Sequence, residues 1–595
     1  MSAHVDALCL RHGIATAYGA RAVPEATKRL ILERIGVEIP EDGAHACFVP
    51  ESLREAPAWG LFCQLYELRS GRGWGIGDFT DLAALAGVAG RAGADFLGIN
   101  PLHALFLADP GMCSPFSPSS RRFLNPLYVD PEALPGWGAA GQDAPGLEGD
   151  VVDYAAVTEA KLAALRAVHA ARPFGEGAFS REAHGAFVEA GGEALRLHAV
   201  FEALSLAMAA EGHGAAFGGW PEPLRDARGQ AARDFAEARA DEVAFHLWLQ
   251  WIADVQLAGA AHAAREAGMR IGLYLDLAVA EAQGGSAAWG DPGLAMPGLS
   301  VGAPPDVFAA EGQDWGLAAP SPAAMEASGF AAFRGMIRAQ LRHAGALRID
   351  HAMALRQLFL IPWGEPPLAG AHLRYPMDEL LDVLGEESRA SRALVIGEDL
   401  GFVPDGFRKV MEAARILSYR ILYFEQAGQG DALAFAPPAA WPEGALACIS
   451  THDLPTLEGW WAGEDIALRR AHGLVGEVES AQHLAHRGDE RGALLALLRA
   501  EGLDPGPASG QGAPPGLTVA AHRLLARTPA WLVGVRLADL VGPAAPTNLP
   551  GTTEQYPNWR LRAPLPLSEI EEHPLFAAVA QAMRAERPRP SGAQA

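Results

Sequence analysis

Cysteine, lysine and asparagine are scarce in this chain of 595 residues. The 5 cysteines have neither a paired spacing nor a metal-site spacing, which argues against a disulfide framework and favours a reduced compartment. The segment Met1 to Asp6 lacks a basic stretch followed by an apolar one, so no secretion signal is expected. No run is long and apolar enough to span a bilayer. We therefore expect a cytoplasmic protein.

The scarcity of lysine and asparagine accompanies an abundance of Arg, Ala, Gly and Pro, as a coding preference acting on the whole chain would produce. Asparagine tolerates left-handed backbone and caps turns with its side chain, so the few that remain mark demanding turns. All of them lie in segments flanked by Pro or Gly: Asn100, Asn125, Asn548 and Asn558.

The charge balance is strongly acidic, with a formal net charge of −24 and an isoelectric point near 5.2. Such a surface repels nucleic acid and anionic membranes, so neither is expected as a partner. It suits a neutral substrate. The chain is also too long for one compact core, unless that core is a large barrel that carries insertions.

Eight short apolar runs have the length and the continuous hydrophobicity of strands that are buried on both faces of a parallel sheet. Helical stretches lie between most of them. We therefore predict an α/β fold, a (β/α)8 TIM barrel. The expected strands are Trp59 to Leu65, Asp95 to Ile99, Arg270 to Leu275, Ala346 to Ile349, Ala393 to Ile396, Tyr419 to Phe424, Ala445 to Ile449 and Trp531 to Val535.

The spacing of these runs predicts the domain organisation. A small helical segment is expected over 1–50, the catalytic barrel over 51–565, and a carboxyl-terminal helix with a disordered tail over 566–595, the disorder beginning at Arg587. Two long interruptions fall inside the barrel. The first, 102–269, must form an insertion subdomain, and the second, 284–322, is a loop region rich in Gly and Pro.

Three short segments that carry carboxylates follow predicted strands: the one with Asp350 after Ala346 to Ile349, the one with Glu398 after Ala393 to Ile396, and the one with Asp453 after Ala445 to Ile449. A parallel barrel gathers its chemistry at the carboxyl ends of its strands. An Asp, a Glu and a second Asp at that face make a glycosidase-like site with a nucleophile, a proton donor and a third carboxylate. Any one of them alone is more often a helix cap or a solvated loop residue.

Together with the segment Ile271 to Val279, these carboxylate segments resemble the four motif regions of the α-amylase clan. More narrowly, the chain resembles the 4-α-glucanotransferases (amylomaltases, disproportionating enzymes), glycoside hydrolase family 77, from about Trp59 to Arg562. The supporting segments are Gly73 to Phe79, Ser114 to Ser120, Gly302 to Asp306, Gly312 to Gly316 and Asn548 to Thr552. Cys113 and Phe116 depart from the pattern, since the family often has tyrosines there. The chain is also shorter at its amino end than longer bacterial members, so their extra β-rich domain is not expected here.

The resemblance implies a retaining transfer of a maltodextrin segment from one 1,4-α-glucan to the 4-hydroxyl of glucose or another maltooligosaccharide. Asp350 is then the nucleophile, Glu398 the acid and base, and Asp453 the residue that stabilises the distorted sugar. No metal and no cofactor are implied. A monomer or a small homo-oligomer is expected.

Six further residues are expected to contact the substrate. Arg348 lies two residues before Asp350, so both point to the same side of a strand, where Arg348 can also reach Asp276. His103 and His452 are expected to bind sugar hydroxyls. Phe308 and Trp315 are expected to form an aromatic lid on the acceptor side, although both could instead fix the loop to the insertion subdomain.

Three alternatives remain open at this point. A metal-dependent barrel hydrolase would use His103, His351 and His452, but these residues have no close metal-binding spacing. A glucan-binding module without activity would not need three intact carboxylates. An α-glucan hydrolase or branching enzyme of the same clan would share the scaffold, because one fold hosts many activities. The segment 302–316 favours the glucanotransferases.

Overall fold

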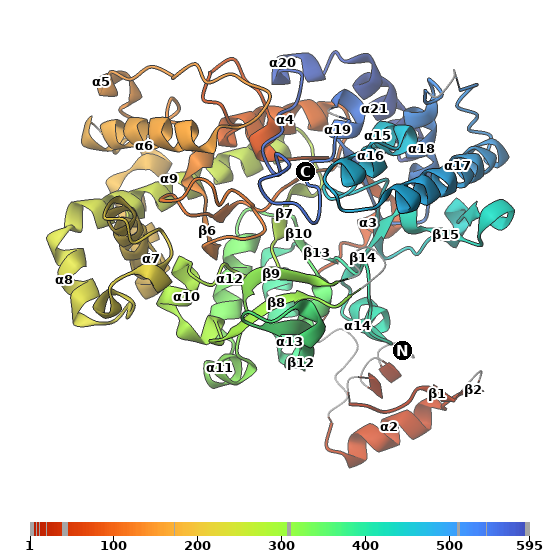
Figure 1. Ribbon diagram of the computed structural model, residues 1–595, viewed down its shortest axis with the longest axis horizontal. Helices are drawn as coiled ribbons and strands as arrows, with labels where there is room; N and C mark the ends of the chain where they lie inside the picture. The colour runs from red at the N-terminus through yellow and green to blue at the C-terminus, as the bar shows by residue number, and fades with distance from the viewer. Residues whose placement is uncertain are drawn as a thin grey trace.

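The structure is a computed structural model that describes residues 5–6, 9–10, 12–18, 21–37, 46–171, 173–305, 311–508, 512–542 and 544–589. Its centre is a closed barrel of eight parallel strands surrounded by helices (Figure 1), which confirms the predicted (β/α)8 fold. In chain order the barrel strands are β3 (Ala58–Cys63), β4 (Phe96–Ile99), β7 (Gly272–Leu277), β10 (Ala346–Ile349), β13 (Leu394–Gly397), β14 (Leu417–Ile421), β17 (Ala445–Cys448) and β18 (Leu532–Arg536).

Each barrel strand overlaps one of the apolar runs in the sequence. The sixth run is displaced, because β14 begins at Leu417, and Leu422–Phe424 forms a 3-10 helix that leaves the barrel wall. The main helices are α4 (Phe79–Arg91), α9 (Ala240–Glu266), α12 (Ala331–Leu341), α13 (Met377–Ser391), α14 (Phe407–Ala413), α15 (Leu457–Ala462), α17 (Glu477–Ala500), α18 (Leu517–Ala526) and α21 (Pro574–Glu586).

The barrel interior is filled by aromatic rings that need glycine on the neighbouring strands. Phe62 makes edge contacts with Phe96 and Tyr274, at centroid distances of 5.6 and 5.0 Å. A Cβ at Gly98 would lie 2.1 Å from the Phe62 ring, and one at Gly534 would lie 2.2 Å from it. Because packed interiors leave no spare volume, these glycines make room for the ring. The interior of the barrel is therefore packed with side chains, and the barrel opens only near the ends of its strands.

The segment between β4 and β7 contains the helices α6 (Tyr154–Ala171), α7 (Arg181–Ala210), α8 (Gln230–Ala238) and α9. The side chains Phe245, Trp248, Leu249 and Ile252 of α9 are all buried, as their helical spacing predicts. A second apolar cluster lies in this region, around Phe201, Trp220 and Trp289. The insertion thus has packing of its own and also rests against the barrel helix α4 through α9.

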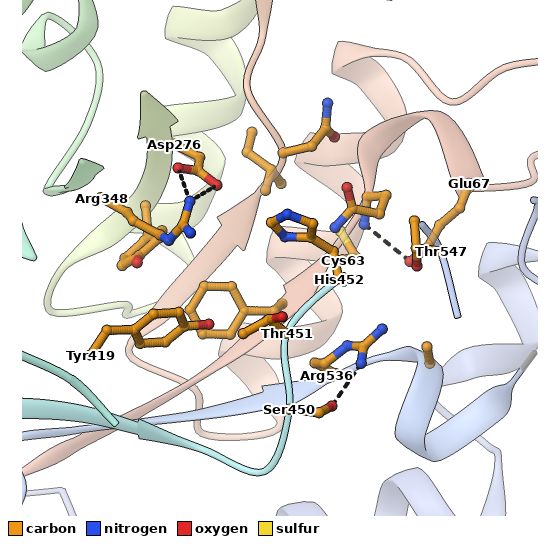
Figure 2. A pocket seen from close by; sticks show the side chains of 16 residues that line it. Cys63, Glu67, Asp276, Arg348, Tyr419, Ser450, Thr451, His452, Arg536 and Thr547 are labelled. Carbon is orange, nitrogen blue, oxygen red and sulfur yellow. Dashed lines mark hydrogen bonds and ion pairs between the residues drawn. The ribbon is translucent and has the colours of Figure 1, made fainter. Parts of the chain in front are cut away.

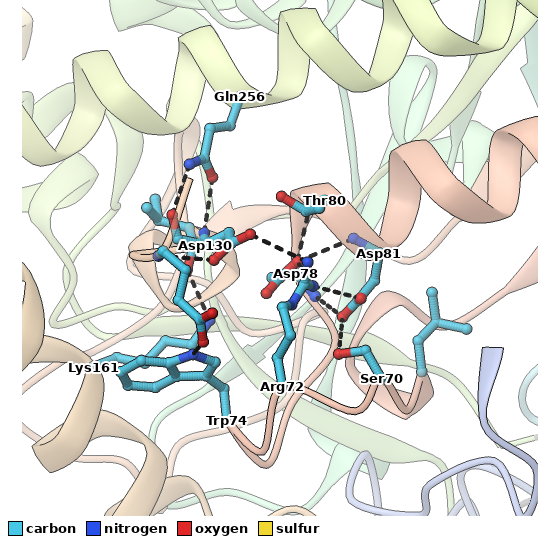
Figure 3. A network of polar contacts seen from close by, with 12 residues as sticks. Ser70, Arg72, Trp74, Asp78, Thr80, Asp81, Asp130, Lys161 and Gln256 are labelled. Atoms are coloured by element: carbon cyan, nitrogen blue, oxygen red, sulfur yellow. Dashed lines mark hydrogen bonds and ion pairs between the residues drawn. The ribbon is translucent and has the colours of Figure 1, made fainter. Parts of the chain in front are cut away.

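A network of charged groups ties the insertion to the first barrel loop (Figure 3). The guanidinium of Arg72 contacts the carboxylates of Asp78, Asp81 and Asp130, at distances of 2.6, 2.5 and 3.2 Å. Asp78 also caps α4 by accepting from the backbone N–H groups of Thr80 and Asp81. From the insertion side, Gln256 of α9 binds the backbone of Asp130. Arg72 thereby connects the loop after β3 to α4 directly, and to α9 through Asp130.

The region 284–322 is more regular than the sequence predicts. It contains the strands β8 (Leu299–Ala303) and β9 (Gln313–Ala318), which join β11 (Gln357–Pro362) and β12 (Ala371–Arg374) in a four-stranded antiparallel sheet. The expectation of a loop region is therefore wrong for β8 and β9. The sheet is completed by the pairing of β8 with β11, a segment far away in the sequence, which a local pattern does not reveal.

The chain ends also add detail. The amino-terminal segment contains α2 (Glu25–Arg34) and a two-residue strand pair, β1 (Ala17–Tyr18) with β2 (Arg21–Ala22). At the carboxyl end Arg587 is buried, and its guanidinium donates to the carbonyls of Ala526, Thr528 and Ala530. The expected disorder from Arg587 onward is therefore wrong for this residue, because its guanidinium hydrogen bonds hold it in place.

Candidate active site

The predicted carboxylates lie at one face of the barrel, at the carboxyl ends of three strands. Asp350 directly follows β10, Glu398 directly follows β13, and Asp453 lies in the loop after β17. The strands β10 and β13 are hydrogen-bonded neighbours, and the Glu398 N–H donates to the Ile349 carbonyl at 3.0 Å. This register places the backbones that carry Asp350 and Glu398 side by side.

Arg348 connects two carboxylates across neighbouring strands. Its Nη1 donates to both carboxylate oxygens of Asp276, at 2.7 and 2.9 Å, and its Nη2 donates to Oδ1 of Asp350, at 2.7 Å. The predicted pairing of Arg348 with both residues is confirmed. Burial alone would lower the pKa of Arg348, but Asp276, Asp350 and Glu398 raise it well above its ordinary value. The side chain is therefore a permanent cation directed at Asp350.

Glu398 is the most enclosed of the three carboxylates, with 9% of its surface exposed. Its Oε2 accepts from the His351 N–H at 3.0 Å, and its Oε1 accepts from the Leu400 N–H at 2.6 Å. Burial raises the pKa of Glu398 to about 7, Asp350 adds to the rise, and Arg348 with the two N–H groups opposes it. Near neutral pH this carboxyl group can hold a proton and can also lose it, as an acid and base must.

The turn that delivers one of these N–H groups is strained. His351 has a φ of 46°, in the left-handed region, which costs about 1–2 kcal/mol for a residue with a side chain. In that conformation its N–H reaches Glu398 and its ring makes an edge contact with Trp315, at a centroid distance of 5.5 Å. Burial lowers the pKa of His351 to about 4, so the ring is neutral at pH 7. The strain thus serves the orientation of Glu398.

Asp453 is held from two sides and is open to the cleft, with 43% of its side chain exposed. His452 Nε2 lies 3.2 Å from its Oδ2, and Asn548 Nδ2 donates to its Oδ1 at 2.6 Å. Partial desolvation would raise the pKa of Asp453, but His452 and Asn548 outweigh it and lower the pKa to about 2. Asp453 is therefore an anion throughout the physiological range, in contrast to Glu398.

A polar cavity lies beneath the carboxylates, inside the mouth of the barrel (Figure 2). Asp276, Arg348 and His452 line one side of it, and Glu67 and Arg536 line the opposite side. Burial raises the pKa of Glu67 to about 7, although Arg536 and the Gln64 N–H oppose the rise. Asp350, Glu398 and Asp453 do not line this cavity, but its lining residues Arg348 and His452 contact Asp350 and Asp453.

The remaining predicted binding residues are placed unequally. Trp315 lies on β9 beside His351. His103 is 1% exposed, and its Nε2 accepts from the Ala278 N–H at 3.2 Å, while its Nδ1 has no partner among the described residues. It adjoins the end of β7 without lining the cavity. Phe308 lies outside the described residues.

Sequence reasoning missed Asn548 as a contact of the third carboxylate. It was assigned a turn role with the other asparagines, and Asn125 does cap a 3-10 helix in that way. One sequence feature pointed to Asn548: it is the first residue of the segment Asn548 to Thr552, which resembles the family. Phe116, where the family often has tyrosine, stacks on the His452 ring at a centroid distance of 4.6 Å. This residue therefore contacts the side chain that holds Asp453.

The described residues contain no cluster of three or more His, Cys, Asp or Glu side chains arranged to hold a metal ion. Within the same residues, no helix combines the length and the apolar character needed to cross a membrane. All five cysteines are buried and unpaired.

If Arg348 orients Asp350 through its planar fork, Arg348→Lys should lower kcat/KM by about a hundredfold, because one ammonium group cannot serve both carboxylates and misplaced groups lose about that much. The measurement is steady-state turnover of maltotriose. Arg338→Lys is the matched control, since the side chain of Arg338 on α12 is 65% exposed and pairs with a single carboxylate, Glu387 of α13. Activity of Arg348→Lys near that of the control would make Arg348 a barrel-wall residue only.

Comparison with known proteins gives a consistent result. The family model for 4-alpha-glucanotransferase matches residues 63–567. The 4-alpha-glucanotransferase of Mycobacterium tuberculosis is 39% identical over 568 residues, covering 90% of this chain and 76% of that protein. The 4-alpha-glucanotransferase of Haemophilus influenzae is 36% identical, covering 88% of this chain and 78% of that protein.

The solved structures extend this result to the fold. The amylomaltase of Corynebacterium glutamicum superposes with a TM-score of 0.79 and 31% identity, covering 90% of this chain and 76% of that one. The amylomaltase of Streptococcus agalactiae in complex with acarbose superposes with a TM-score of 0.71 at 18% identity, which supports the fold alone. From the family match and these relatives, the chain belongs to the 4-alpha-glucanotransferase family.

Proposed function

We propose that this protein transfers a segment of a 1,4-α-glucan to the 4-hydroxyl of glucose or another maltooligosaccharide, with Asp350 as nucleophile and Glu398 as acid and base. The observation that carries the proposal is the contrast between the two groups. Asp350 faces the permanent cation Arg348 at 2.7 Å, whereas Glu398 is buried with a pKa of about 7. Two carboxyl groups whose environments differ in this way suit the two roles of a retaining mechanism.

In the first step a carboxylate oxygen of Asp350 attacks the anomeric carbon of the donor, and the bond from that carbon to the glycosidic oxygen breaks. Glu398 gives its proton to the departing oxygen, so the shortened glucan leaves as an alcohol. The donor segment remains as an ester on Asp350. In the second step ionised Glu398 takes the proton of the acceptor 4-hydroxyl, and its oxygen displaces Asp350 with net retention. No metal or organic cofactor takes part in these steps.

The other polar groups bind and orient the donor sugar. Asp453, which stays ionised, is suited to hydrogen-bond ring hydroxyls and to stabilise the positive charge that develops at the anomeric carbon. His452 adjoins it and Asp276 lies below, in the cavity. The expected contact of His103 with a sugar hydroxyl stays a prediction, because this side chain is buried beside the end of β7. We place the protein in the cytoplasm, where maltodextrins and free thiols coexist.

A product profile from maltotriose tests the proposal. Transfer without net hydrolysis yields glucose together with a ladder of longer 1,4-linked oligosaccharides, and the number of reducing ends stays constant. An α-glucan hydrolase would increase the reducing ends and give no longer products. A branching enzyme would introduce 1,6 linkages, which nuclear magnetic resonance distinguishes. Either of those outcomes would replace the proposed transfer.

Trp315 bears on why transfer should prevail over hydrolysis. Water competes with the acceptor for the ester on Asp350, so transfer requires a held acceptor and the exclusion of water. We expect Trp315→Ala to raise the ratio of glucose release to disproportionation on maltotetraose about tenfold, while overall turnover survives in part, since the carboxylates stay intact. Trp363→Ala, at an exposed tryptophan at the end of β11, is the control. Parallel loss of both activities would make Trp315 structural.

A further inference from the structure

A row of three rings, Phe359, His372 and Phe402, lies at one edge of the four-stranded sheet, where β12 pairs with β11. His372 of β12 contacts Phe359 of β11 at a centroid distance of 5.1 Å and Phe402 at 6.5 Å. At the opposite edge, Trp315 of β9 contacts His351, the residue after Asp350, at 5.5 Å.

Phe402 is the outermost ring of this row and is largely bare, with 69% of its surface exposed. The ring is tilted by 34° against that of His372, and Phe359 beneath His372 is buried. Burial also lowers the pKa of His372, which keeps its ring uncharged at neutral pH. Phe402 thus contacts His372 on one side and is exposed to solvent on the other, so it offers an apolar face to a ligand.

The position of Phe402 follows from the loop that begins at Glu398. The Leu400 N–H donates to Glu398 Oε1 at 2.6 Å, and Gly401 has a φ of 74°, so the chain turns around the carboxyl group. Four residues of chain extend over at most about 14 Å, so Phe402 lies within a few sugar units of Glu398. A glucan bound at the carboxylates can therefore reach this ring.

The role proposed for Glu398 indicates which part of the glucan reaches Phe402. An acid and base of a retaining enzyme lies on the side of the leaving group and, later, of the acceptor. We infer that Phe402 and His372 form an acceptor subsite, here named the aromatic shelf, on which sugar rings beyond the first acceptor sugar stack. The inference rests on the proposed function and adds to it a preference for longer acceptors. Glucose alone fills only the first acceptor position and does not reach the shelf.

The test separates acceptor binding from donor cleavage by using α-maltotriosyl fluoride as donor, since fluoride leaves without occupying the acceptor side. Transfer is measured to glucose, maltotriose and maltopentaose. Phe402→Leu should lower kcat/KM for maltopentaose by about three- to tenfold, the size of one aromatic stacking contact, and leave transfer to glucose within about twofold. Phe402→Trp should keep the wild-type preference for longer acceptors.

Trp363→Ala serves as the matched control, because Trp363 directly follows β11 and is 58% exposed, and the variant should change transfer to no acceptor. An equal loss with glucose and maltopentaose, or no change in Phe402→Leu, would overturn the shelf. If the wild-type protein hydrolyses the fluoride without transfer to any acceptor, the proposed function itself fails. The two failures are thus told apart by the wild-type reaction.

Discussion

Asp350→Asn should abolish transfer and hydrolysis together, with a loss on the order of 10⁴ to 10⁶ in kcat, the range found when a covalent nucleophile is removed. The reason is that the neutral amide is a poor nucleophile and cannot hold the donor segment as an ester. Arg348 would also lose the anion that it faces at 2.7 Å. The measurement is release of glucose and of longer products from maltotriose, followed to the detection limit.

Two further measurements make this test specific. Asp405→Asn removes the same charge from an exposed position of the loop after Glu398 and should retain nearly full activity. Mass spectrometry of the wild-type protein during turnover of a glycosyl fluoride should find the added sugar on the peptide that contains Asp350. A sugar found on any other peptide, or an Asp350→Asn variant within tenfold of wild type, would assign the nucleophile elsewhere.

Glu398→Gln should be nearly as damaging with ordinary glucans, with a loss of about 10²- to 10⁴-fold, the usual contribution of general acid catalysis. The loss should shrink with a glycosyl fluoride donor, because fluoride leaves without a proton. The ester on Asp350 should then accumulate, since the base that activates the acceptor is missing. Equal losses on both donor types would refute the assignment of Glu398 as the acid.

The same residue predicts a pH profile. Glu398 must be protonated for cleavage of natural donors, and its pKa is about 7. In the wild-type protein, kcat/KM for maltotriose should therefore fall as the pH rises through about 7, because the ionised fraction cannot donate a proton. Glu398→Gln should lose this basic limb. Asp453, with a pKa of about 2, should contribute no change in the range from pH 5 to 9.

The barrel could be predicted from the sequence because its strands are short and buried on both faces. Each strand therefore appears in the sequence as a continuous apolar run. The position of the carboxylates followed from those runs, since each of the three lies within four residues of the end of one. Arg348 and Asp350 could be paired for the same reason: residues two apart on a strand point to the same side. The four-stranded sheet β12–β11–β8–β9 was not predicted, because its strands lie among glycines and prolines and its two hairpins are joined by the long-range pairing of β8 with β11.

The sequence by itself predicted the candidate residues for the chemistry: Asp350, Glu398 and Asp453, with Arg348 beside the first. Only the tertiary structure decided their ionisation, because that depends on neighbours that no local spacing specifies. Asn548 reaches Asp453 from 95 residues away, and the His351 N–H reaches Glu398 from the neighbouring strand. The row of rings that ends at Phe402 likewise exists only after the sheet has formed. Burial and charge at a site are properties of the closed barrel, so they follow from folding rather than from pattern.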